Sequence, residues 1–242
     1  MAKFTRKELK KDPFLSVYYD DFVEFAQNHY QSVILVAAAV AVIILAGISW
    51  RRHRAGQDLT ASTLLGEALA TYRADVGQPS QAGSQATQAP AFPDASAKYQ
   101  AAIKQFRTIW QKYPSRKAGQ IALYHVGLCE AQLGNSGAAI SVLRQAGQFA
   151  DKDIASLAQF SLADELARSG KPAEARSIFT NLAEHPTDAV PAATAWLALA
   201  GIERESNPAQ ARKVYQRVIK DFGSDSDLAG AVQEQMASLP AH

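Results

Sequence analysis

Histidine, cysteine and paired carboxylates carry most enzyme chemistry, and in this sequence none of them forms the pattern of a site. The five histidines are scattered, and no two of them have the spacing of metal ligands. The single cysteine, Cys129, follows Gly127 in an apolar stretch and has no evident base near it. Asp164 and Glu165 are adjacent, so on a helix they would point in different directions. We therefore predict that the chain is not an enzyme and that it uses neither a metal ion nor a cofactor.

The overall composition is that of a globular protein. The chain has 242 residues, of which 48% are hydrophobic and 20% are charged, and these values exclude a wholly disordered chain. Lys and Arg number 25 against 23 Asp and Glu, so a net charge of +2 gives no case for nucleic-acid binding. A single cysteine excludes an intrachain disulfide. We expect protein partners and no nucleic acid.

An uncharged apolar run lies near the start of the chain. Residues 33–48 include no charged or hydrogen-bonding side chain. Extended to residues 31–50, the run would form a helix of about 30 Å, which matches the hydrocarbon thickness of a bilayer. Tyr30 and Trp50 lie at its two edges, and Arg51, Arg52 and Arg54 follow directly. The sequence therefore predicts a transmembrane helix at residues 31–50.

Residues 1–30 predict a tail that contains an amphipathic helix. Asp12 and Pro13 are a helix start signal, and aromatic residues then recur at helical spacing: Phe14, Tyr18, Phe22 and Phe25. The charges leave the orientation open. Basic residues next to the apolar run favour a cytoplasmic C-terminus, whereas those of the whole tail favour a cytoplasmic N-terminus.

The remainder of the chain repeats itself with helical spacing. Four segments share a small alanine, a large apolar residue four positions later and another apolar residue three positions beyond it: Ala102/Phe106/Ile109, Ala139/Leu143/Ala146, Ala175/Phe179/Leu182 and Ala211/Tyr215/Val218. Another helix precedes each of these segments. Helix-breaking residues separate the paired helices at Gly134-Asn135, Gly170-Lys171-Pro172 and Asn207-Pro208. The pattern predicts about four stacked helix pairs.

Close approach explains the small residues. We expect the small residues of the first helices (Gly127, Ala163, Ala200) to meet the alanines of the second helices (Ala139, Ala175, Ala211). The large residues then fill the space between pairs, because no single pair buries its own apolar face. The predicted repeat domain covers residues 56–239 and ends in a capping helix over residues 226–239. A flexible linker at residues 76–94, rich in Gln, Ala, Ser, Gly and Pro, interrupts it.

These positions resemble those of tetratricopeptide repeats. Gly127, Gly134 and Ala139 have the spacing of that family's small residues, Leu143 stands at its aromatic position, and Trp196 stands at its Trp position. The chain departs from the pattern at Glu130 and Gln159, where the family has aromatic residues, and in its longer repeat. The resemblance implies an all-α fold, here a single transmembrane helix followed by an α-solenoid and a capping helix.

A narrower resemblance follows from the order of tail, apolar run and degenerate repeats, which is similar to the YfgM-like group of ancillary SecYEG translocon subunits. That resemblance implies a single-pass protein of the inner (cytoplasmic) membrane, with its N-terminus in the cytoplasm and its repeats in the periplasm. The implied partners are translocon subunits, periplasmic chaperones or secreted clients.

We therefore predict a membrane-anchored protein–protein interaction scaffold that is an accessory factor of the secretion translocon and the periplasmic chaperone network. Two alternatives stay open: an assembly factor of the cell envelope (outer membrane or cell wall), and a cytoplasm-facing tethering or regulatory module. The first helices of the pairs are expected to line the binding surface. The candidate protein-binding residues are Gln120, Tyr124, Gln159, Asp164, Trp196 and Arg204.

Overall fold

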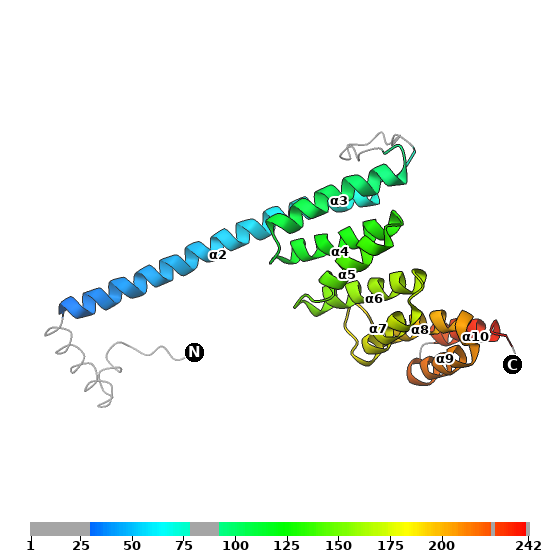
Figure 1. The fold of residues 1–242 in the computed structure, drawn as a ribbon. Helices are drawn as coiled ribbons and strands as arrows, with labels where there is room; N and C mark the ends of the chain where they lie inside the picture. Colours follow the sequence, from blue (N-terminus) through cyan, green and yellow to red (C-terminus); the bar gives the residue numbers. More distant parts are fainter. Residues whose placement is uncertain (1–29, 78–91, 224–225, 241–242) are drawn as a thin grey trace, which may run out of the picture. The chain divides into compact units, whose positions relative to one another are not determined.

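A computed structural model of the chain describes residues 30–77, 92–223 and 226–240 (Figure 1). Within these residues the secondary structure is helical, apart from turns and one isolated parallel β-bridge between Val76 and Phe92. The chain divides into two compact units, residues 1–56 and 57–242. The predicted tail up to residue 29 and the central part of the predicted linker, residues 78–91, lie outside the described residues.

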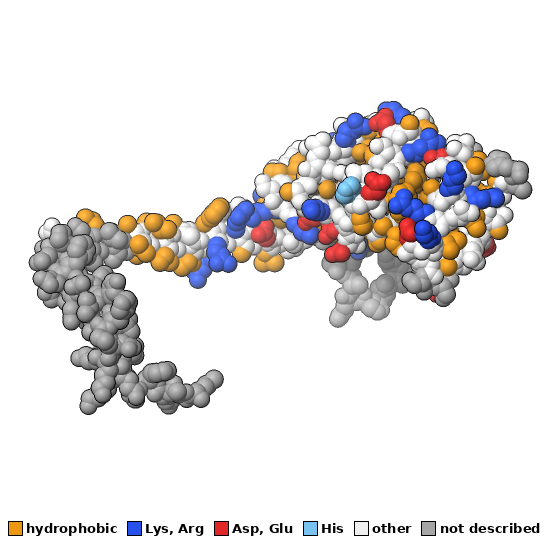
Figure 2. Space-filling view, turned by 90° about the horizontal axis from the view of Figure 1, so that it is seen from below, with side chains coloured by type: hydrophobic (Ala, Val, Ile, Leu, Met, Phe, Trp, Pro, Cys, Tyr) orange, Lys and Arg blue, Asp and Glu red, His pale blue; other side chains and the backbone are white. Residues whose placement is uncertain are grey.

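Helix α2 spans Tyr30–Arg73, and its first part belongs to the first unit. Large hydrophobic side chains on this part are exposed to solvent, among them Ile34, Leu35, Ile43 and Trp50. Figure 2 shows such hydrophobic side chains along the surface of the helix.

The structure corrects the prediction of a transmembrane helix at residues 31–50. Among the residues that the structure describes, no helix is both long enough and apolar enough to cross a membrane. The predicted run without polar side chains covers residues 33–48, which is shorter than the about 20 residues that a membrane-spanning helix needs. Instead of ending at Trp50, α2 continues through three arginines. The predicted location in the inner membrane, with a cytoplasmic N-terminus and periplasmic repeats, is corrected with it.

The second unit is built from antiparallel helices that pack against one another in chain order (Figure 1). Residues 57–73 of α2 pack against α3 (Ala95–Lys112) through a cluster that includes Ala61, Leu65, Ala102 and Phe106. Three further pairs and a last helix follow: α4 (Lys117–Gln132) with α5 (Ser136–Ala146), α6 (Lys152–Arg168) with α7 (Pro172–Glu184), α8 (Ala192–Ser206) with α9 (Pro208–Phe222), and α10 (Ser226–Ala237). The predicted helix pairs are therefore present in this unit, and α10 packs on α9.

The predicted helix breakers do form the turns within the pairs. Gly134 and Gly170 have φ values of +77° and +81°, a backbone conformation that residues with a side chain rarely adopt. In both turns the amide after the glycine donates to a carbonyl of the last helical turn, Asn135 to Glu130 at 2.9 Å and Lys171 to Leu166 at 2.8 Å. The third turn differs, because the side chain of Asn207 accepts a hydrogen bond from the amide of Gln210 and so caps α9.

The closest packing between α4 and α5 lies at Gly127. A Cβ atom added to this glycine would lie 2.7 Å from both Cγ and Cδ2 of Leu143, which is closer than real Cβ atoms come to their neighbours. The contact is thus made with Leu143, one turn beyond the expected partner Ala139. Ala163 and Ala200 occupy the equivalent place in the next two pairs and are fully buried. Small residues at these positions allow the paired helices to touch.

We predict opposite effects of alanine at two helical glycines. Gly127→Ala forces a methyl group against Leu143, whereas Gly201→Ala in α8 adds a methyl group where no atom lies within 4 Å. Gly201→Ala should raise the free energy of unfolding by about 0.5–1 kcal/mol through helix propensity. Because overpacking costs about 1–3 kcal/mol, Gly127→Ala should be less stable than Gly201→Ala by about that amount. Urea unfolding followed by circular dichroism measures the difference, and equal stabilities would refute the close contact.

Candidate protein-binding surfaces

The first helices of the last three pairs lie next to one another, because α6 contacts both α4 and α8. We call the exposed side of α4, α6 and α8 the first-helix face. Tyr124 on α4 and Ser161 on α6 connect two of these helices through a hydrogen bond of 3.3 Å between their hydroxyl groups. The three helices therefore form a continuous surface.

A hollow of about 620 Å³ lies between α6, α7 and α8. Its hydrophobic lining includes Phe160 and Ile202, which are half-buried, and Phe179, which is buried. The rings of Phe160 and Phe179 meet edge to face with centroids 5.1 Å apart. The other lining residues are Asp164, Ala167, Arg168, Gly170, Pro172, Ala198, Gly201 and Ser206. An apolar side chain of a partner fits such a lining.

The charges beside this hollow do not cancel. Nη2 of Arg168 lies 2.8 Å from Oδ2 of Asp164 and 3.2 Å from Oε2 of Glu165. The Glu165 side chain is only 4% exposed, whereas Asp164 and Arg168 are more than half exposed. One cation thus serves two carboxylates, so the group carries one negative charge in excess and favours a basic partner group.

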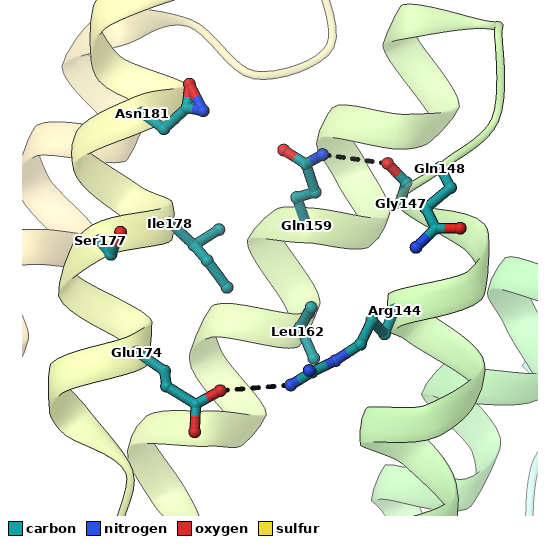
Figure 3. Close-up of a pocket in the computed structure, with 9 residues that line it drawn as sticks. All are labelled: Arg144, Gly147, Gln148, Gln159, Leu162, Glu174, Ser177, Ile178 and Asn181. Carbon is teal, nitrogen blue, oxygen red and sulfur yellow. Dashed lines mark hydrogen bonds and ion pairs between the residues drawn. The ribbon is translucent and has the colours of Figure 1, made fainter.

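A second surface lies on the other side of α6. Two adjoining hollows of about 440 and 530 Å³ share Gly147, Gln148, Gln159 and Asn181, and together they form what we call the α5–α7 groove. Figure 3 shows its first part, with α5 and α7 as walls and α6 as the floor. Leu162, Ile178, Leu182 and Phe149 contribute hydrophobic surface, and the polar lining residues include Arg144, Glu174, Ser177, Lys152, Ser156, His185 and Thr187.

Gln159 is held in place on the floor of this groove. Its Nε2 donates to the carbonyl oxygen of Gly147 at 3.0 Å. A Cβ atom at Gly147 would lie 3.0 Å from Cγ of Gln159, so the glycine allows the two helices to approach. Because the carbonyl can only accept, the amide nitrogen of Gln159 must face it, and the Oε1 atom then faces α7 across the groove (Figure 3).

The six predicted binding residues do not form a single cluster. Tyr124 and Asp164 lie on the first-helix face, Gln159 lies in the α5–α7 groove, and Arg204 is exposed on α8. Gln120 is half-buried on α4. Whether these residues bind a partner stays a prediction.

Trp196 lies inside the helix packing rather than on a surface. It is 6% exposed, and Cζ of Arg217 on α9 lies 4.0 Å from the centre of its ring. Its place in the structure is therefore that of a packing residue between α8 and α9.

The sequence did not identify several lining residues of either surface. Phe160 and Ile202 in the hollow, and Gln148 and Asn181 in the groove, were absent from the predicted set. Phe160 could have been found, because it precedes Asp164 by one helical turn on the same first helix. Gln148 and Asn181 carry no comparable signal, since one lies in the turn after α5 and the other on α7, and the sequence does not specify the distance between them.

Among the groups whose pKa values are shifted by burial are a thiol and an imidazole. Cys129 is fully buried, and burial together with the nearby Glu130 raises the pKa of its thiol to about 12, so it is protonated at neutral pH. Burial lowers the pKa of His125, with a smaller opposing effect from its hydrogen bond to the Ile121 carbonyl and a further lowering by Arg73. Within the described part of the chain, no group of three or more His, Cys, Asp or Glu side chains could hold a metal ion.

His125 lies in a cluster of aromatic rings. Its ring centroid is 5.1 Å from that of Phe106, 5.2 Å from that of Tyr124 and 5.6 Å from that of Tyr72. These residues come from the first two helix pairs, so the cluster joins the pairs where the first-helix face begins.

Comparison with known families identifies the repeats. A family model described as tetratricopeptide repeat matches residues 91–153 and 160–227, which together make up more than half of the chain. No curated protein matches the chain. The narrower resemblance to the YfgM-like group therefore has no support from a relative.

We predict that His125 makes stability depend on pH. The folded state keeps this imidazole neutral, so stability is full above the unfolded pKa of 6.5 and is lost as the pH falls below it towards the lower folded pKa. The loss is at most about 1.4 kcal/mol for each pH unit. A His125→Phe variant should lack this part of the pH dependence. Urea unfolding of both proteins between pH 7.5 and 5 should show wild type losing more stability, and parallel curves would contradict the prediction.

Proposed function

Because the chain belongs to the tetratricopeptide repeat family, we propose that it is a protein–protein interaction scaffold that binds its partner on the first-helix face. Repeats of this family usually mediate binding to other proteins. Stacked helix pairs also supply what a scaffold needs, namely an extended rigid surface whose residues come from several repeats. That the protein performs no catalysis stays a prediction.

The observation that carries this proposal is the hollow between α6, α7 and α8. Phe160 and Ile202 offer it an apolar lining, and Gly201 leaves open space above α8. Well-packed pockets that accept an apolar anchor are where most binding energy of protein interfaces is concentrated. We infer that the partner inserts one apolar side chain here.

The charges favour a partner with a basic residue beside that anchor. Asp164 and Glu165 share the single cation of Arg168, and Asp164 is exposed enough to form a second ion pair. An exposed pair adds little affinity, but it orients the partner and raises the rate of association.

More specifically, we propose that the protein acts as a scaffold at the secretion translocon. This role is supported by the resemblance in the order of sequence segments, whereas the family match supports protein binding in general. The alternatives are an assembly factor of the cell envelope and a tethering or regulatory module. Identification of the proteins that co-purify with the full chain distinguishes the translocon role from the envelope role. Translocon subunits among these proteins favour the translocon role, and envelope-assembly proteins without translocon subunits favour the envelope-assembly role.

We predict that filling the hollow abolishes partner binding without unfolding the protein. Gly201→Arg places a long side chain in the hollow from an exposed helical position with no atom within 4 Å. Gly137→Arg is a matched control, because Gly137 also has no atom within 4 Å but lies on α5, outside the hollow.

Quantitative pull-down with the full chain, compared by mass spectrometry, tests this prediction. Proteins retained by wild type and by Gly137→Arg should be lost with Gly201→Arg, while thermal unfolding shows that all three proteins are folded. Retention of the same proteins by Gly201→Arg would overturn the assignment of the binding face.

A further inference from the structure

We propose that the α5–α7 groove is a second binding site, which holds an extended polypeptide segment of a partner by its main chain. This inference goes beyond the proposed function, because it concerns the opposite side of α6 and a different kind of recognition. It rests on the carboxamide groups of Gln148, Gln159 and Asn181, which line both parts of the groove.

A carboxamide is the side-chain equivalent of a peptide group. It offers N–H donors and a carbonyl acceptor, and every residue of an extended chain other than proline presents one donor and one acceptor of the same kind. A groove lined by carboxamides therefore pairs with the main chain whatever the partner's side chains are.

The two central carboxamides present opposite ends to the groove. Gln159 gives its nitrogen to the Gly147 carbonyl, which leaves its oxygen as an acceptor on the floor. Nδ1 of His185 lies 3.1 Å from Oδ1 of Asn181 and 3.2 Å from the Asn181 carbonyl oxygen. Since the carbonyl oxygen only accepts, Nδ1 of His185 carries the proton and donates to the oxygens of Asn181. The Nδ2 atom of Asn181 is therefore left to donate to a partner.

Figure 3 agrees with this assignment, because the oxygen of Gln159 and the nitrogen of Asn181 are both turned towards the groove. The α7 wall thus offers a hydrogen-bond donor, and the α6 floor offers an acceptor. An extended chain between them would accept a hydrogen bond from Asn181 on one of its carbonyl oxygens. A neighbouring amide of the same chain would donate a hydrogen bond to Gln159.

The remaining lining fits an extended chain rather than a charged ligand. Nη2 of Arg144 and Oε2 of Glu174 lie 3.2 Å apart, so this pair neutralises itself across the groove (Figure 3). Leu162 and Ile178 supply apolar surface for the side chains that alternate along an extended strand. Nothing in this part of the groove selects a strongly acidic or basic partner.

The test uses the full chain and a fluorescein-labelled peptide of alternating Ser and Val, with a Lys at each end for solubility. Fluorescence anisotropy should show saturable binding. The same peptide with N-methyl groups on alternate amides keeps its side chains but loses main-chain donors, so it should bind at least tenfold more weakly. Asn181→Leu and Gln159→Leu should each weaken binding of the unmethylated peptide about two- to tenfold, as expected for one lost hydrogen bond.

Gln145→Leu is the matched control, because Gln145 is an exposed carboxamide on α5 that does not line the groove. It should leave the affinity unchanged.

Asn181 is exposed, so Asn181→Leu should stay folded even where Gln159→Leu does not, and thermal unfolding checks this. The proposal is overturned by absence of binding up to millimolar peptide, by equal affinity for the N-methylated peptide, or by an equal loss with Gln145→Leu. Gly201→Arg should bind the peptide normally, which separates this site from the first-helix face.

Discussion

The stacking of this protein depends on close contacts in which a helix backbone or a methyl group touches a large side chain of the next helix. Gly127 brings α4 onto Leu143, and fully buried Ala163 and Ala200 stand at the same place in the next two pairs. Close-packed interiors do not absorb added volume, so these small residues set the distance between paired helices. That distance in turn positions the first helices side by side and leaves the α5–α7 groove open on their other side.

Two of the ion pairs that join successive helix pairs end on glutamates at the same place of a first helix, and the ion pair at the groove does not. Arg107 pairs with Glu130 at 2.8 Å, and Arg176 pairs with Glu203 at 2.6 Å. These two glutamates are each three residues beyond the small residue of their helix, whereas in α6 that position holds Leu166. Arg144 directly follows Leu143, as Arg107 directly follows Phe106, but it pairs instead with Glu174 on α7, so its side chain spans the groove.

The features that local chemistry dictates could be predicted from the sequence, and those that depend on the distance between helices could not. Gly134, Gly170 and Asn207 were recognised because a positive φ or a cap leaves a residue-type signature. The departures from the family pattern had no explanation before the structure: Glu130 is bonded by both Arg107 and Asn135, and Gln159 bonds Gly147. Hydropathy alone predicted a membrane span at residues 31–50, which the described helices do not support. The carboxamides of the α5–α7 groove come from the turn after α5, from α6 and from α7, so no single segment showed them.

A double-mutant cycle between Gly127 and Leu143 tests the close contact most directly. Gly127→Ala should destabilise the wild-type protein, but in a Leu143→Ala background the added methyl group meets empty space and gains helix propensity. The double mutant should therefore be more stable than the sum of the two single effects predicts, by about 1–3 kcal/mol. Urea unfolding of the four proteins measures this coupling energy. Additive effects of the two substitutions would contradict the contact on which the helix stacking is built.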